Sequence, residues 1–331
     1  MNKKISVFII LLMLSTLLVI TSTNTMFTWM MMELNMMVFT PLICLLGSTN
    51  EADTSIKYLV PQSLASSLFM MSIIMTSYWP YSNVLASISL LMKVGSAPFH
   101  AWFPVIMYSI NLMAGFLMMT WQKLIPLFMI MNTQLSYPPL ILMSAAITAL
   151  WGSVAGLNQT NMMSLLTFSS IAHLSWLISA SILNPNMSLF YFATYTLTLL
   201  PIFLVMQTFN KKTHKAILQS SMNTYLQVIL TMNLLSLAGM PPFAMFTAKI
   251  PIIIMMTKSL PILAVMLIST TISLCFYMTI IFSVLLSPMY LMMSMIKSNM
   301  LKNSFALSIM FQLSCLPLTL YFISNWLGKL K

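Results

Sequence analysis

Long apolar stretches, separated by short polar segments, follow one another along almost the whole chain. Each stretch is about 20 residues long, which is the length a helix needs to cross the hydrocarbon core of a bilayer. The pattern predicts about eleven crossings, at residues 5–22, 26–47, 58–77, 83–104, 112–131, 138–157, 160–182, 188–208, 223–256, 260–285 and 304–325. We therefore predict an all-α polytopic membrane protein whose residues 1–331 form a single membrane domain.

Two of the predicted crossings contain proline breaks, at Ser96–His100 and at Gly239–Phe243. A proline inside a spanning helix frees backbone groups that neighbouring helices or water must satisfy. If residues 1–131 and 138–285 are two five-helix repeats, followed by a C-terminal loop and last helix in 286–331, the breaks occupy equivalent positions and the second repeat is inverted. Paired broken helices are typical of the binding region of a transporter.

The composition supports a membrane protein without a soluble domain. Hydrophobic residues make up 60% of the chain and charged residues 5%, against about a quarter charged in globular domains. The net charge of +11 comes from 14 lysines against Glu33, Glu51 and Asp53. In a membrane chain such charge is interpreted loop by loop and does not indicate nucleic-acid binding. The side of the N terminus carries Lys3, Lys4, Lys57, Lys211, Lys212, Lys215, Lys297 and Lys302, and the other side carries Lys258, Lys329 and Lys331. By the positive-inside rule the N terminus faces the matrix or cytoplasm.

The residue usage points to a mitochondrial gene. Arginine is absent, methionine occurs 37 times and glycine only 7 times, as expected of AT-rich coding with a genetic code that is generous to methionine. We therefore predict the mitochondrial inner membrane as the location.

Four ionisable residues lie inside predicted crossings: Glu33, Lys93, Lys123 and Lys249. A charge at bilayer depth costs about 2.5–3.5 kcal/mol even on lenient insertion scales, so it usually lines a water-filled path or an ion route. Lysine suits a proton relay because its ammonium group is readily neutralised when it is desolvated, whereas arginine stays charged. The alternative is that each lysine extends to an interface or neutralises a partner.

Glu33 is the only acid in a predicted crossing, and we expect it to pair with Lys93. His173 follows Ser169 and Ser170 on an apolar helix and could pass protons through water, although a structural histidine is an equal alternative. His100 follows the first proline break and could hydrogen-bond the freed backbone or act as a relay.

No cofactor or metal site is expected on this chain. Cys44, Cys275 and Cys315 are isolated and interpreted as inert core thiols, and no CxxC, GxGxxG, phosphate loop or Ser/His/Asp set occurs. The GxxxG spacing of Gly152 and Gly156 is interpreted as close helix packing.

Several long motifs resemble a known family. They are MELN (32–35), LMKVGSAPFHAWFP (91–104), TWQKLIP (120–126), GLNQT (156–160), SSIAH (169–173) and LAGMPPF (237–243). The chain resembles the antiporter-like membrane subunits of mitochondrial NADH:ubiquinone oxidoreductase, respiratory complex I. The resemblance covers about residues 26–250. It departs where Asn161–Ser164 lacks the usual basic residue and where Ser175 replaces a frequent glycine.

The resemblance implies an antiporter-like fold that translocates protons through Glu33, Lys93, Lys123, His173 and Lys249. It implies that NADH, flavin, iron–sulfur clusters and ubiquinone bind to other subunits. The implied partners are other membrane-arm subunits, including a neighbouring antiporter-like subunit, and the lipid bilayer.

Two alternatives remain. Multisubunit sodium/proton antiporters share the expected fold, although the mitochondrial composition argues against them. A structural subunit with functionless charges is the second alternative, and it predicts that replacing the lysines affects assembly but not coupling.

Overall fold

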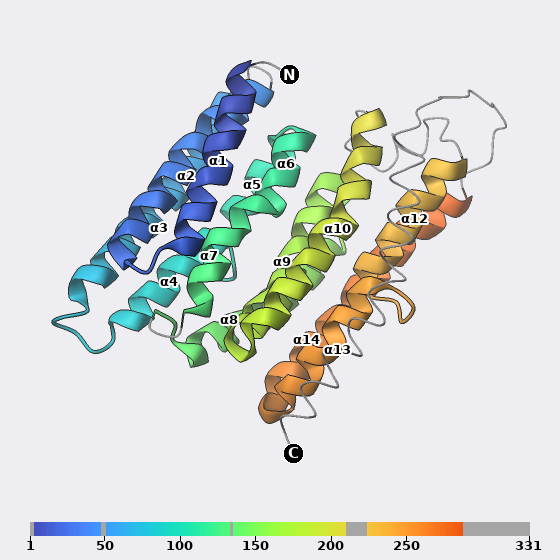
Figure 1. Ribbon diagram of the computed structural model, residues 1–331. Coiled ribbons are helices and arrows are strands. Elements are labelled where there is room, and N and C mark those ends of the chain that lie inside the picture. The colour runs from blue at the N-terminus through green and yellow to red at the C-terminus, as the bar shows by residue number, and fades with distance from the viewer. Residues whose placement is uncertain (1–2, 48–50, 133–134, 210–223, 287–331) are drawn as a thin grey trace. The chain divides into compact units, whose positions relative to one another are not determined.

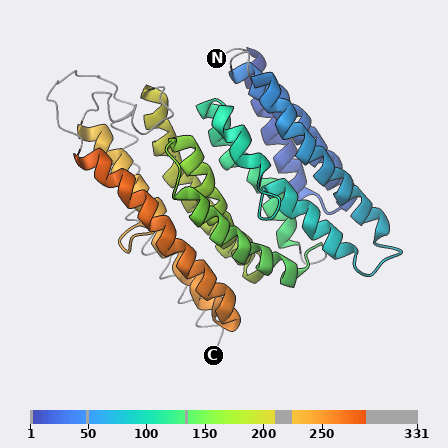
Figure 2. The ribbon, with the colours of Figure 1, turned by 180° about the vertical axis from the view of Figure 1, so that it is seen from behind.

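The computed structural model describes residues 3–47, 51–132, 135–209 and 224–286. These residues are almost entirely helical and contain no β-strand element (Figures 1 and 2). Ten predicted crossings lie at least partly within them, and each is helical. Among the described residues, 8 helices are long and apolar enough to cross a membrane. The chain is therefore a multi-pass membrane protein; the predicted crossing at 304–325 lies outside the described residues.

The contacts of the chain form two compact units. The first comprises Met1–Thr148 and His173–Ile182, and the second comprises Ala149–Ala172 and Leu183–Lys331. The predicted division into two inverted five-helix repeats stays a prediction.

Among its described residues, the first unit contains seven complete helices. They are α1 (Lys3–Thr21), α2 (Thr25–Leu46), α3 (Glu51–Met75), α4 (Ser82–Val94), α5 (Trp102–Ser109), α6 (Leu112–Met119) and α7 (Trp121–Met131). The second contains α10 (Pro185–Phe209), α12 (Thr224–Ala238), α13 (Ala244–Met255), the 3-10 helix η1 (Met256–Ser259) and α14 (Leu260–Leu286). Helices α8 (Pro138–Gly156) and α9 (Met162–Leu183) are divided between the units.

Helices α1, α2 and α3 lie side by side in both views (Figures 1 and 2), and α3 also packs on α4. Asn24 caps the start of α2, because its side chain accepts a hydrogen bond from the Met26 amide at 3.0 Å. At the other end of α2 the Asn111 amide group donates to the Leu46 carbonyl. A tryptophan joins α2 to α3, since Trp29 Nε1 donates to the Ser66 carbonyl at 3.2 Å.

The first proline break separates α4 from α5. Gly95 ends α4 with φ +78°, a conformation that glycine adopts without strain. Its amide and that of Ser96 both donate to the Leu91 carbonyl at 3.1 Å. Two neighbouring helices satisfy the next carbonyls, since Trp102 Nε1 of α5 donates to Met92 O and Gln62 Nε2 of α3 donates to Lys93 O. The carbonyls of Leu91, Met92 and Lys93 at the end of α4 therefore have partners.

A further break was not predicted. The crossing expected at 112–131 is interrupted at Thr120, between α6 and α7, where φ is −111° and ψ is −75°. The Thr120 hydroxyl donates to the Phe116 carbonyl at 2.7 Å, so the side chain supplies a bond at the interruption. Helix α3 also begins at Glu51, seven residues before the predicted start at 58.

In the second unit, the predicted break between α12 and α13 is present, and Gly239 ends α12 with φ +82°. Figure 1 shows the short loop that joins these helices. Close packing at the GxxxG spacing is confirmed as well. A Cβ atom on Gly152 would lie 2.6 Å from the Ala172 amide nitrogen and 2.9 Å from the Phe168 carbonyl oxygen of α9, so this glycine lets two helix backbones touch.

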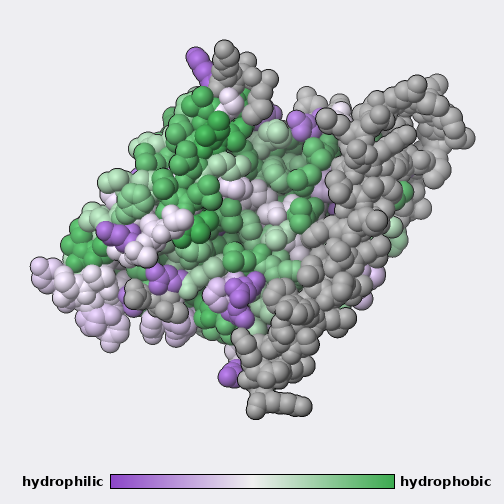
Figure 3. All heavy atoms as spheres, viewed as in Figure 1, coloured by the Kyte–Doolittle hydropathy of each residue, from purple (hydrophilic) through white to green (hydrophobic). Residues whose placement is uncertain are grey.

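Apolar side chains dominate the visible surface over α1 to α3 (Figure 3). The exposed apolar residues of α1 include Val7, Ile10, Leu14 and Leu17. Such a surface matches a lipid environment.

Cys44 of α2 and Cys275 of α14 are also exposed, so their interpretation as core thiols is wrong. Hydropathy correctly identified the helices that contain these cysteines. It could not show which face of a uniformly apolar helix packs inward, because that depends on the neighbouring helices. Cys315 lies outside the described residues.

Candidate functional site

The titratable residues singled out from the sequence are buried, with the exception of Glu33. Lys93 is 8% exposed, Lys123 3%, Lys249 6% and His173 5%, while Glu33 is half-buried. Glu33, Lys93, Lys123 and His173 belong to the first unit and Lys249 to the second. The lysine ammonium groups therefore do not extend to the exposed surface of the chain, which argues against the alternative of interfacial lysines.

Lys93 stands in the last turn of α4, where the partial negative charge of the helix end favours a cation. Its Nζ contacts the sulfur of Met32 on α2 at 3.8 Å. Glu33, the next residue on α2, acts electrostatically on Lys93. The expected direct salt bridge does not form among the described residues, because the amine is directed at the thioether of Met32.

Lys123 stands in the first turn of α7, directly after the break at Thr120. Its Nζ lies 5.0 Å from the centre of the Phe103 ring, within the range of a cation–π contact. A row of aromatic rings leads from α2 to this contact. Successive ring centres are 5.2 Å apart from Phe39 to Tyr58, 6.1 Å to Trp102 and 5.6 Å to Phe103.

Two small cavities lie beside the lysines of the first unit. In each, the centre of a water molecule can move within a volume of about 20 Å³. The first is lined by Tyr58, Gln62, Lys93, Val94, Trp102, Phe103, Met118, Gln122 and Lys123. The second is lined by Met32, Asn35, Met36, Tyr58, Gln62, Lys93, Gln122, Ile125 and Pro126. One water needs roughly 10–15 Å³ on this measure, so each cavity has room for about one.

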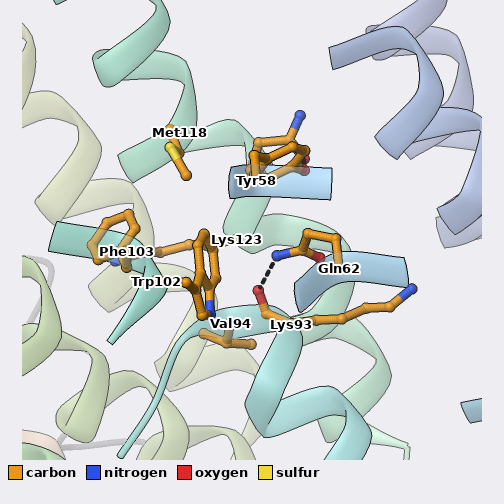
Figure 4. Close-up of a pocket in the computed structure, with 9 residues that line it drawn as sticks. Tyr58, Gln62, Lys93, Val94, Trp102, Phe103, Met118 and Lys123 are labelled. Carbon is orange, nitrogen blue, oxygen red and sulfur yellow. Dashed lines mark hydrogen bonds between the residues drawn. The ribbon is translucent and has the colours of Figure 1, made fainter. Parts of the chain in front are cut away.

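Figure 4 shows how the residues of the first cavity lie. Lys123 lies next to the aromatic residues Phe103 and Trp102, whereas the Lys93 side chain extends away from them. The dashed line is the 3.1 Å bond from Gln62 Nε2 to the Lys93 carbonyl. The backbone of Lys93 and the side chain of Lys123 thus contribute to one polar cavity, while the Lys93 amine approaches α2.

Sequence reasoning missed the neutral polar residues of these cavities, Asn35, Tyr58, Gln62 and Gln122. The Tyr58 hydroxyl donates to Gln122 Oε1 at 3.3 Å, which links α3 to α7. A signal was present, since Tyr58 and Gln62 stand four residues apart and therefore on one face of a helix. Asn35 and Gln122 also lie within the MELN and TWQK motifs.

His173 and its serines lie on α9. The hydroxyls of Ser169 and Ser170 donate to the carbonyls of Leu166 and Thr167, at 2.8 and 2.7 Å. The serine oxygens can still accept hydrogen bonds, but both hydroxyl hydrogens are already donated to carbonyls of the same helix. The first proline break holds His100, whose side chain hydrogen-bonds the Pro98 backbone.

Lys249 of α13 reaches back to the end of α12. Its Nζ lies 2.9 Å from the position that a Cβ atom would take on Gly239. The amine therefore lies against the C-terminal end of a half-helix, where backbone carbonyls and the helix dipole favour positive charge. Gly239 leaves the space that the amine occupies, in addition to adopting a left-handed conformation.

The described residues contain no group of three or more His, Cys, Asp or Glu side chains that could hold a metal ion. The described part of the site instead contains buried lysine amines, side-chain amides, the phenol of Tyr58 and space for water. Such a set can hold and move protons.

The sequence model of one family, described as the NADH:quinone oxidoreductase/Mrp antiporter transmembrane family, matches residues 81–275. The chain belongs to this family. The match contains Lys93, Lys123, His173 and Lys249, whereas Glu33 and Asn35 lie before it.

Curated members of the family extend the likeness to most of the chain. The chain is 34% identical to the NADH-ubiquinone oxidoreductase chain 2 of Lumbricus terrestris, over 85% of this chain and 86% of the relative. It is also 34% identical to that of Anopheles gambiae, over 92% of this chain and 91% of the relative.

A solved structure agrees in fold. A chain of respiratory complex I from Thermus thermophilus, determined with bound aureothin, superposes with a TM-score of 0.84. The superposition covers 95% of this chain and 78% of that chain, at 18% sequence identity. The antiporter-like fold expected from the sequence is thereby confirmed.

Proposed function

We propose that this chain is subunit 2 of respiratory complex I, an antiporter-like membrane-arm subunit that translocates protons. The names of the relatives, NADH-ubiquinone oxidoreductase chain 2, support this assignment. The observation that carries the proton-translocating role is the burial of three lysines within apolar helices of a family member. A buried ammonium group is retained at such a cost where it serves a path for ions or water.

The proposed relay consists of Glu33, Lys93, Lys123, His173 and Lys249. The two amines of the first unit border cavities with room for water, and Lys249 lies at the end of a half-helix. Lysine holds a proton when hydrated or near an anion and releases it when desolvated. Glu33 would bias the charge of Lys93, and the amines and His173 would carry the proton onward.

The remaining parts of the proposal concern the surroundings of the chain. NADH oxidation and ubiquinone reduction would take place on other subunits, which would hold the flavin and iron–sulfur clusters. The chain would lie in the mitochondrial inner membrane with its N terminus in the matrix. Its partners would be other membrane-arm subunits, including a neighbouring antiporter-like subunit, and lipid.

The decisive test replaces Lys123 in the assembled complex. Lys123→Met removes the amine, and Lys123→Arg keeps a positive charge that cannot release its proton. We expect both variants to assemble and to pump fewer protons per NADH oxidised. Coupled turnover should fall about a hundredfold or more, which is the usual contribution of a side chain that transfers protons. The exposed Lys258→Met is the matched control and should pump normally.

The outcome separates the alternatives. Normal pumping by Lys123→Arg would show that this lysine does not titrate during turnover. A structural subunit predicts that Lys123→Met lowers the amount of assembled complex and leaves the proton yield of the remaining complex unchanged. The family also includes Mrp antiporters, and a dependence of pumping on sodium would favour that class.

A further inference from the structure

The two cavities of the first unit share a wall. Tyr58, Gln62, Lys93 and Gln122 line both of them. Within this wall the Tyr58 hydroxyl donates to Gln122 Oε1 at 3.3 Å. Lys123 lines only the first cavity and Asn35 only the second. The shared side chains therefore stand between the surroundings of Lys123 and those of Asn35.

Asn35 is the most unusual member of the second cavity. It is 3% exposed, and neither its Oδ1 nor its Nδ2 has a hydrogen-bond partner among the described residues. A buried amide without a partner costs roughly 1–3 kcal/mol per group. Natural proteins usually satisfy such a group with protein or with ordered water.

Gln122 adds more unused hydrogen-bonding capacity to the same place. Its Nε2 also lacks a partner among the described residues. Its backbone carbonyl cannot receive the usual bond from four residues later, because that residue is Pro126, which has no N–H. Pro126 itself lines the second cavity. Donors and acceptors from α2 and α7 thus border one cavity.

We propose that Asn35 and Gln122 are positioning residues that hold ordered water, and that this water carries protons between Lys93 and Lys123. The inference rests on the proposed proton-translocating function. A water molecule usually makes about three hydrogen bonds to buried polar groups, and the two amides and the Gln122 carbonyl can supply them. The size of each cavity, with room for about one water, suits this occupant and no larger ligand.

An N–H bond of the Lys93 ammonium breaks, and its proton passes to the first water. That water gives one of its own protons onward, and an N–H bond forms at the neutral Lys123 amine. Each water ends with two protons, Lys93 becomes neutral and Lys123 becomes charged. Asn35 and Gln122 exchange no proton in this step, because their amides only orient the water.

The test is a pair of substitutions at Asn35 in the assembled complex. Asn35→Leu keeps the branching of the side chain at Cγ but is bulkier and removes both polar groups, so the second cavity loses the Asn35 amide and has less room for water. Asn35→Ser keeps a hydroxyl and leaves more room for water. We expect Leu to lower the proton yield and coupled turnover by up to about a hundredfold, the scale of a reacting group misplaced by about 1 Å, and Ser to retain most of both.

A structural role predicts the opposite result for Leu. Replacing an unpartnered buried amide by an apolar group of similar shape should then be neutral or stabilising, with pumping unchanged. Thr28→Val is the matched control on the same helix. The buried Thr28 hydroxyl already has a partner within α2, because it donates to the Thr25 carbonyl at 2.7 Å. It should leave pumping and assembly unchanged.

The outcomes separate this inference from the proposed function. If Lys123→Met lowers pumping while Asn35→Leu does not, the water site is overturned and the relay stands. If neither variant lowers pumping, both proposals fail. A map of the assembled complex that resolves ordered water should show water bonded to the Asn35 amide, and a well-resolved cavity without water would also overturn the inference.

Discussion

Neighbouring residues, more than their own helices, determine where the buried amines lie. Lys123 lies over the Phe103 ring, and Lys93 is directed at the Met32 sulfur. Lys249 occupies the space beside Gly239. Each lysine carries a long flexible side chain, so these contacts choose among many rotamers. A small change in the neighbour should therefore displace the amine without removing it.

Gly239→Ala tests this at Lys249. The new Cβ would lie 2.9 Å from Lys249 Nζ, and the flexible end of the lysine would have to move. We expect the complex to assemble with a lower proton yield. The reference is Gly95→Ala, which has a similar positive φ of +78° and meets the Trp102 ring at 3.2 Å instead of an amine. Both changes carry a backbone cost of about 1–2 kcal/mol. Equal proton yields in the two variants would show that only the backbone matters.

Glu33 and Lys93 are expected to act as one electrostatic unit even though they form no direct salt bridge. In Glu33→Gln the amine loses the acid that acts on it, and in Lys93→Met the acid loses its cation. The double variant should therefore lose much less pumping than the sum of the two single losses. Strictly additive losses of proton yield in this cycle would show that the two residues work independently.

At the scale of helices, interrupted spans depend on partners from neighbouring helices. The end of α4 is satisfied by side chains of α3 and α5, and α8 reaches the backbone of α9 through a glycine. In lipid there is little hydrophobic drive between helices, so such close contacts and hydrogen bonds hold the bundle together.

Gly152→Ala should destabilise the contact of α8 with α9. The added methyl would meet backbone atoms at 2.6 Å and 2.9 Å, which cannot rotate away, and overpacking of this kind costs about 1–3 kcal/mol. Gly156→Ala is the matched control, because its Cβ would meet the Phe276 ring at 2.9 Å and a ring can shift. Thermal unfolding of the purified complex should begin at a lower temperature for Gly152→Ala than for Gly156→Ala. The reverse order would contradict the backbone contact.

At the scale of the whole molecule, loop charge is expected to orient the protein in its membrane. Eight lysines are assigned to the side of the N terminus and three to the other side. Several of them, including Lys211–Lys215 and Lys329, lie outside the described residues. The orientation therefore stays a prediction from the positive-inside rule.

Labelling from each side of the membrane tests the orientation. The N terminus and Lys211–Lys215 should react from the matrix side, and Lys329 and Lys331 from the intermembrane space. Inner-membrane vesicles of opposite sidedness provide the control for access. Reaction of the C terminus from the matrix side would show that the orientation, or the count of eleven crossings on which it depends, is wrong.

The sequence by itself determined the helical membrane class, the helical structure of the ten predicted crossings that lie at least partly in the described residues, and both proline breaks. It also identified Lys93, Lys123 and Lys249, because a charge in an apolar run is visible without any knowledge of packing. These features are local: hydropathy, proline and charge act within a single helix.

Only the tertiary structure decided which groups meet. It showed the break at Thr120, the direction of Lys93 toward Met32, the exposure of Cys44 and Cys275, and the contact of Lys249 with Gly239. It also brought Asn35, Tyr58 and Gln122 from three helices to adjoining cavities. Cavities and side-chain directions arise from how separate helices pack, and in uniformly apolar helices the sequence carries little periodic signal of which face packs inward.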